Sequence, residues 1–159
     1  MSTAAGQAGL SPEEALQRAR VIWRVLLLGQ VGFAGVIGAL FWSRATPQDP
    51  GELSRLLTRI GLGLLLVVVP LAYTVRSRIF RGAEEGRPTP PASYLQGTIV
   101  FLAMCEFVSL FSLVAVYLHG RFFPPFIATL AAVLVQAFNL PTGREMRPSE
   151  AESAPIEPH

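Results

Sequence analysis

The sequence predicts an all-α membrane protein with four transmembrane helices and both termini in the cytoplasm. Of its 159 residues, 51% are hydrophobic and 15% are charged, and the mean hydropathy of +0.44 is high for a soluble domain of this size. The apolar residues gather in four runs, and a bilayer about 30 Å thick takes roughly 20 helical residues per crossing. The arginines border these runs, as charges that flank membrane spans do.

The first element is a helix that is predicted to begin in an N-terminal cytoplasmic segment, residues 1–19. Ser11 and Glu14 form a capping box and Pro12 occupies the first helical position, so the segment should be helical from about residue 11. The apolar run that follows is not expected to be a cleavable signal peptide, because FWSRATP offers no small-x-small cleavage site. The helix should therefore continue into the first span.

The transmembrane domain is predicted over residues 20–140. Its spans are expected at about 21–43, 56–76, 94–118 and 122–140. Trp42 is an interfacial anchor for the first span, and Pro70 should kink the second because it lacks a backbone donor. Pro124 and Pro125 fit the first turn of the fourth span, which should end near Pro141.

The orientation follows from the arginines, because positive charge in short loops stays on the cytoplasmic side. Nine arginines favour that side for both termini: Arg18, Arg20, Arg24, Arg76, Arg78, Arg81, Arg87, Arg144 and Arg147. Four lie on the other side: Arg44, Arg55, Arg59 and Arg121. Residues 141–159, rich in proline and charge, are predicted to form a disordered cytoplasmic tail. Because the chain has no lysine, its arginine bias suggests a GC-rich bacterial genome, and hence a multi-pass protein of the bacterial inner membrane.

Several function classes are excluded by what the chain lacks. Its single cysteine, Cys105, rules out an internal disulfide and a Cys-x-x-Cys site. Its two histidines, His119 and His159, lie at a span end and at the C-terminus, so no metal or other cofactor is expected. The spans offer no base for a serine nucleophile, and the arginines form no single patch for nucleic acid. The sequence therefore predicts a protein that is not an enzyme and does not bind nucleic acid.

Glu106 is the one ionisable residue that lies far from both ends of a span. A charged carboxylate at this depth costs at least ~2.5 to 3.5 kcal/mol, so we expect it to be protonated. In one interpretation the neutral acid joins helices, together with Ser109 one turn away on nearly the same face. In the other, Glu106 carries a proton or cation.

The segment AMCEFVSLFSLV, residues 103–114, resembles the carboxylate-bearing helix of rotary ATPase proteolipid (c-type) subunits. An alanine precedes the glutamate by three residues, and Leu-Val follows it by seven and eight. In that family the matching glutamate binds and releases the transported ion, and the resemblance implies this role for Glu106. The chain departs from the family by lacking its Gly-x-Gly helix and by placing the carboxylate on the third of four spans.

A second set of residues predicts contact between the first and fourth spans. Gln30, Ala34 and Gly38 recur every fourth residue, and Ala128, Ala132 and Gln136 repeat this spacing in reverse order. Small residues let antiparallel helices approach, and glutamines at matching depth can then form a hydrogen bond. The alternative is that the alanines only fill space.

Together these features predict a non-enzymatic integral membrane protein, a structural or accessory subunit of a larger membrane assembly or a homo-oligomer. Its expected partners are the lipid bilayer and either other membrane subunits or further copies of the chain. The alternative function is a small transporter, or a proton- or cation-translocating unit, that uses Glu106.

Overall fold

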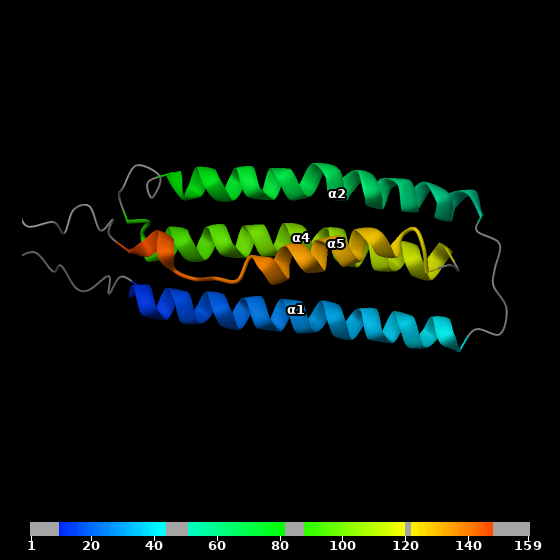
Figure 1. The fold of residues 1–159 in the computed structure, drawn as a ribbon, viewed down its shortest axis with the longest axis horizontal. Helices are drawn as coiled ribbons and strands as arrows, with labels where there is room; N and C mark the ends of the chain where they lie inside the picture. The colour runs from blue at the N-terminus through cyan, green and yellow to red at the C-terminus, as the bar shows by residue number, and fades with distance from the viewer. Residues whose placement is uncertain (1–9, 44–50, 82–87, 120–121, 148–159) are drawn as a thin grey trace, which may run out of the picture.

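The computed structural model describes residues 10–43, 51–81, 88–119 and 122–147, and this part of the chain is helical without strands. Its helices are α1 (Pro12–Trp42), α2 (Glu52–Ile79), α4 (Pro91–His119) and α5 (Phe126–Phe138), followed by the short 3-10 helix η1 (Arg144–Met146). Helices that follow one another in the chain run in opposite directions (Figure 1). The starts of α1 and α4 therefore lie at the same end of the bundle as the ends of α2 and α5.

The first helix begins where the capping signals predict. The Ser11 hydroxyl accepts a hydrogen bond from the Glu14 backbone N–H, and the Glu14 carboxylate accepts one from the Ser11 backbone N–H, both at 3.2 Å. From Pro12, α1 continues without a break to Trp42, as predicted. Pro70 lies inside α2, which continues as one helix from Glu52 to Ile79.

Helices α1, α2 and α4 are each long and apolar enough to cross a membrane. The fourth apolar run forms a helix shorter than the predicted span of about 122–140, because α5 covers Phe126–Phe138. Its 13 residues extend about 20 Å, short of a hydrocarbon core about 30 Å thick. The reason is the Pro124–Pro125 pair: a residue before proline is disfavoured in the α conformation, so the helix begins only after the second proline.

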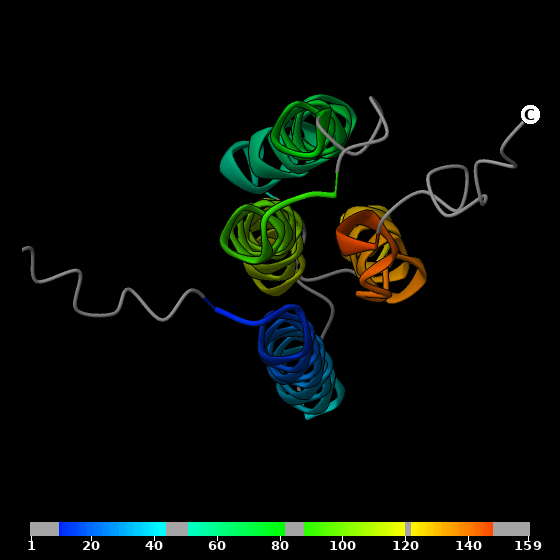
Figure 2. The same cartoon turned by 90° about the vertical axis from the view of Figure 1, so that its left-hand side faces the viewer.

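The four helices form a layer of three with the fourth on one side. Figure 2 looks along the helices and shows α4 between α2 and α1, with α5 against α4 on one face of this layer. Accordingly, α4 contributes the largest part of the core, including Phe101, Leu102, Cys105, Val108 and Val116, all at most 1% exposed. We call the opposite side of the layer, which α5 does not cover, the open face.

The segment after α5 differs from the predicted disordered tail. Residues 141–147 continue toward the end of the bundle where α1 and α4 begin (Figure 1) and turn there into η1. Met146 is buried in a cluster with Ala15, Ala19, Phe80 and Tyr94. The turn passes through Gly143, whose φ of 74° is the left-handed conformation that glycine adopts most readily. Apolar burial therefore fixes a stretch whose composition looked solvated, and the predicted tail beyond residue 147 lies outside the described residues.

Candidate functional site

Glu106 lies near the middle of α4 and is half-buried. It follows Leu95 by about three helical turns and precedes Leu113 by about two, so the three residues share one side of the helix. Leu95 lines a groove with residues of α1, and Leu113 packs in a cluster with Ile37 of α1. Glu106 therefore lies along the seam between α4 and α1, where the seam borders the open face.

No side chain among the described residues forms a hydrogen bond or ion pair with the Glu106 carboxyl. Ser109, its predicted neighbour, is fully buried and faces α5, where its backbone carbonyl accepts a hydrogen bond from the Thr129 hydroxyl at 3.2 Å. The Ser109 hydroxyl has no partner in the described part of the chain. The structure thus records no hydrogen bond between Glu106 and Ser109, although residues three apart on an α-helix are neighbours on its surface.

The two glutamines do meet. The Gln30 amide Nε2 donates to Gln136 Oε1 at 3.0 Å, and Gln136 Nε2 donates to the Leu102 carbonyl oxygen of α4 at 3.0 Å. The backbone oxygen of Gln136 accepts a third bond, from the Trp23 indole Nε1 at 2.8 Å. We call this set of bonds among Trp23, Gln30, Leu102 and Gln136 the glutamine junction; it joins α1, α4 and α5.

The small residues beside these glutamines divide into two groups. Ala128 and Ala132 of α5 are buried, and Ala34 of α1 packs against the cluster that contains Ile37. Gly38 does not support the predicted close contact, because a Cβ added there would meet no atom within 4 Å. Of the three α1 residues predicted to contact α5, Gln30 and Ala34 therefore pack into the bundle and Gly38 does not.

Two other glycines have close neighbours across the contact between α4 and α2 with its C-cap residue Phe80. A Cβ added at Gly97 of α4 would stand 2.7 Å from Phe80 Cε1, and one at Gly61 of α2 would stand 3.1 Å from the Ser112 hydroxyl. Sequence reasoning missed both positions. Their signal was glycine within a long apolar helix, one in α4 and two, Gly61 and Gly63, in α2, which does not indicate what each packs against.

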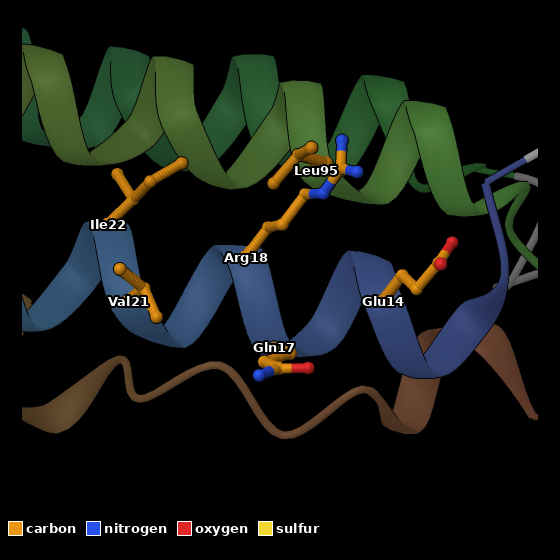
Figure 3. A pocket seen from close by; sticks show the side chains of 6 residues that line it. All are labelled: Glu14, Gln17, Arg18, Val21, Ile22 and Leu95. Atoms are coloured by element: carbon orange, nitrogen blue, oxygen red, sulfur yellow. The ribbon is translucent and has the colours of Figure 1, made fainter.

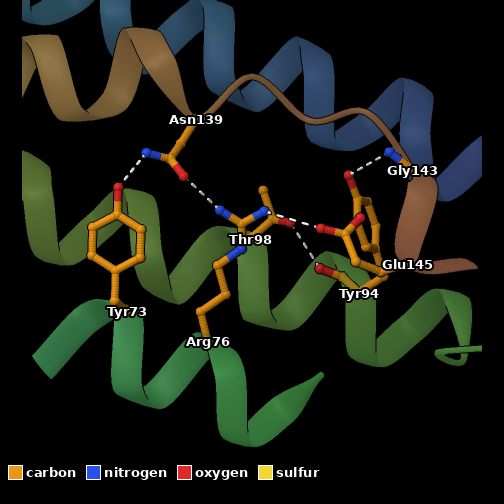
Figure 4. A network of polar contacts seen from close by, with 7 residues as sticks. All are labelled: Tyr73, Arg76, Tyr94, Thr98, Asn139, Gly143 and Glu145. Atoms are coloured by element: carbon orange, nitrogen blue, oxygen red, sulfur yellow. Dashed lines mark hydrogen bonds and ion pairs between the residues drawn. The ribbon is translucent and has the colours of Figure 1, made fainter. Parts of the chain in front are cut away.

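A polar network that the sequence did not predict ties α2 to the end of α5 (Figure 4). Arg76 donates to the Asn139 side chain at 3.0 Å and forms an ion pair with Glu145 at 3.4 Å. Asn139 also contacts the Tyr73 hydroxyl. The guanidinium carbon of Arg76 lies 5.3 Å from the ring centre of Phe101, a cation–π geometry. Arg76, used above only for orientation, thus anchors the segment after α5.

Tyr94 and Thr89 hold the same segment from the start of α4. The Tyr94 hydroxyl accepts a hydrogen bond from the Gly143 backbone N–H at 3.1 Å, and the Thr89 N–H donates to the Glu145 carbonyl at 2.8 Å. Figure 4 shows Tyr94 and Gly143 joined in this way. Because these partners lie far apart in the sequence, spacing alone could not reveal them.

At the other end of the bundle, His119 closes α4 against α2. Its Nδ1 lies 3.3 Å from the Ser54 hydroxyl and 3.5 Å from the Thr58 hydroxyl. No group of three His, Cys, Asp or Glu side chains that could hold a metal occurs within 10–43, 51–81, 88–119 and 122–147. The His119 ring and the two hydroxyls thus connect the end of α4 with the start of α2.

A groove of about 650 Å³ opens in the seam between α1 and α4 (Figure 3). Its lining residues are Glu14, Gln17, Arg18, Val21, Ile22 and Leu95. The charged residues lie toward the start of α1, and the apolar ones lie further along the helix. The same seam leads to Glu106, about three turns beyond Leu95 on α4.

The segment that resembles a proteolipid helix, residues 103–114, forms the middle of α4. α4 is packed on three sides by α1, α2 and α5, as Figure 2 shows. Glu106 thus lies on the middle helix of the layer formed by α1, α4 and α2, and α5 packs on one face of this layer. No family model matches the chain, and neither a curated protein nor a solved structure matches it.

Proposed function

We propose that this chain is a non-enzymatic, multi-pass protein of the bacterial inner membrane and serves as a structural or accessory subunit of a larger membrane assembly or homo-oligomer. The three long apolar helices support the membrane location. Their outward residues support it too: Leu28 of α1 is 70% exposed and Leu66 of α2 is 75% exposed. Large exposed apolar surfaces of this kind require lipid or protein to cover them.

The observation that carries the subunit role is the Glu106 carboxyl, which is half-buried near the middle of α4 without a polar partner in the described residues. Lipid tails offer no hydrogen bond, so a carboxyl at this depth is expected to find its partner on another molecule. Gln30 and Gln136, by contrast, bond within the chain. The unsatisfied group therefore favours assembly over a self-sufficient monomer.

The proposal is tested by isolating the tagged chain, expressed at native level, in mild detergent. A subunit should migrate as a complex larger than one copy, with either further copies or another membrane protein retained. A monodisperse single copy that retains no other protein would contradict the subunit role.

Both termini are proposed to be cytoplasmic, on the basis of the nine-to-four division of arginines. Ala92 is exposed at the end of the bundle where α4 begins, and Glu52 is exposed at the opposite end where α2 begins. In a Cys105→Ala background, Ala92→Cys should react with an impermeant thiol reagent only from the cytoplasmic side. Glu52→Cys, the matched control, should react only from outside, and the reverse pattern would overturn the orientation.

Ion transport through Glu106 remains the competing function, favoured by the same lack of a partner, since an exchanging carboxyl has to be free to take up its ion. A flux measurement on liposomes that contain the chain and a pH-sensitive dye distinguishes ion transport from the subunit role. A transporter should show a proton or cation flux that Glu106→Gln abolishes in a folded protein, because an amide cannot release a proton. A subunit should show no flux, and Glu106→Gln should leave its assembly intact.

A further inference from the structure

The open face of α4 carries a stripe of residues at coiled-coil spacing. Gln96, Ile99, Ala103 and Glu106 follow one another at alternating steps of three and four, the period at which a helix meets a parallel partner. Gln96, Ile99 and Ala103 are exposed, and Glu106 is half-buried. We call these four residues the open stripe.

The open stripe differs from the other outward surfaces in the middle of the bundle. Leu28 and Val31 on α1, Leu66 and Val67 on α2, and Leu130 and Leu134 on α5 are all exposed and apolar. Lipid tails can cover such residues at no cost. Among the described residues, only the open stripe carries an unpaired carboxyl at this depth, so lipid alone is a poor cover for it.

From this contrast we propose that a second copy of this chain docks on the open stripe, with the two α4 helices side by side about a two-fold axis along the membrane normal. This rests on the proposed membrane subunit role and names the partner. A two-fold axis of this direction brings each residue to its own copy at equal depth. Glu106 then meets Glu106 of the second copy.

The hydrogen-bonding groups of the stripe fit this arrangement because they are self-complementary. A protonated carboxyl has one donor and one acceptor, so two of them satisfy each other. The Gln96 amide also carries both donors and an acceptor. Ala103, one turn before Glu106, is small enough for two helices to approach closely.

A cysteine cross-linking experiment in native membranes tests the proposal. In a full-length Cys105→Ala background, Ala103→Cys should form a disulfide-linked dimer on mild oxidation, because a two-fold contact places the two cysteines at equal depth within bonding reach. Leu28→Cys and Leu66→Cys are matched controls on outward faces of α1 and α2 and should remain uncross-linked. Equal cross-linking at all three positions, or none at Ala103→Cys, would overturn the proposal.

The role of the carboxyl is measured in the same Ala103→Cys protein. Glu106→Gln keeps a donor and an acceptor and should retain the dimer, whereas Glu106→Leu should weaken dimer affinity about eightfold, which corresponds to the loss of two membrane hydrogen bonds of ~0.6 kcal/mol each. An unchanged affinity with Glu106→Leu would show that the stripe does not use the carboxyl and would overturn the pairing.

The two proposals fail in different ways. If the chain retains a different membrane protein and Ala103→Cys forms no dimer, the second copy is wrong and the subunit role stands. If the chain is a single copy with no retained partner and no cross-link, both are wrong.

Discussion

The glutamine junction and Glu106 are neighbouring polar sites that differ in their bonding: three hydrogen bonds form the junction, although Gln30 Oε1 has no partner among the described residues, and none reaches the Glu106 carboxyl. Gln136 donates to the Leu102 carbonyl, which is also the helical hydrogen-bond acceptor for the Glu106 backbone N–H, so the two sites are one turn apart on α4. Gln30 and Gln136 are fully buried and bonded across three helices, whereas the half-buried Glu106 carboxyl has no partner in the described chain. The difference teaches that a polar side chain in an apolar helix can serve in two ways: the glutamines join helices inside the bundle, whereas Glu106 leaves a polar group at its surface.

A large effect on stability is expected at Gly97 of α4, which lies against Phe80 at the end of α2. Gly97→Ala should destabilise the fold by about 1 to 3 kcal/mol, because the new Cβ would stand 2.7 Å from the Phe80 ring and force it to move. The measurement is the free energy of unfolding in detergent. Gly29→Ala is the control: its Cβ would meet nothing within 4 Å, so it should stabilise the helix slightly. Equal effects of the two substitutions would contradict the packing described here.

Within the glutamine junction, Gln136→Leu should cost about 1 to 3 kcal/mol, because it leaves the buried Gln30 amide without its acceptor. Leu134→Ala, on the exposed side of α5, is the control and should change the unfolding free energy little. A double-mutant cycle with Gln30→Leu should give a coupling of about 0.6 kcal/mol. Strict additivity would count against the bond.

The turn at Gly143 tests how firmly the end of the chain is held. Gly143→Ala should cost about 1 to 2 kcal/mol locally, since a φ of 74° is strained for alanine and its Cβ would stand 3.1 Å from Leu16. Hydrogen exchange at the Gly143 and Thr89 amides should accelerate. Thr142→Ala, an exposed neighbour, should leave their exchange unchanged, and slow exchange in both variants would show that the turn does not depend on glycine.

The sequence was sufficient to predict the features that depend on local signals. The capping box placed the start of α1, and the four apolar runs gave four helices, of which three are long enough to cross a membrane. The spacing of Gln30 and Gln136 led to a pair that the structure joins by a hydrogen bond. Each of these signals comes either from residues within one helix or from residues that lie at equal depth on two helices.

Other features depend on contacts that spacing does not record. The segment 141–147 looked disordered because its composition is polar, yet Tyr94, Arg76 and buried Met146 hold it against the bundle. Gly97 gave no sign of Phe80 as its neighbour. Whether Glu106 would point inward to Ser109 or toward the open face depended on how α1, α2 and α5 surround α4, which no single helix reveals.

The most direct test of the contrast between the two sites compares Glu106→Ala with Gln136→Leu in the same unfolding experiment, at a detergent dilution that keeps single copies apart. The account predicts that Glu106→Ala changes the unfolding free energy of one copy by less than about 0.5 kcal/mol, because the carboxyl bonds to nothing inside the described chain, while Gln136→Leu lowers it clearly. A Glu106→Ala protein as unstable as Gln136→Leu would show that Glu106 holds the fold together, and would contradict its assignment to the surface.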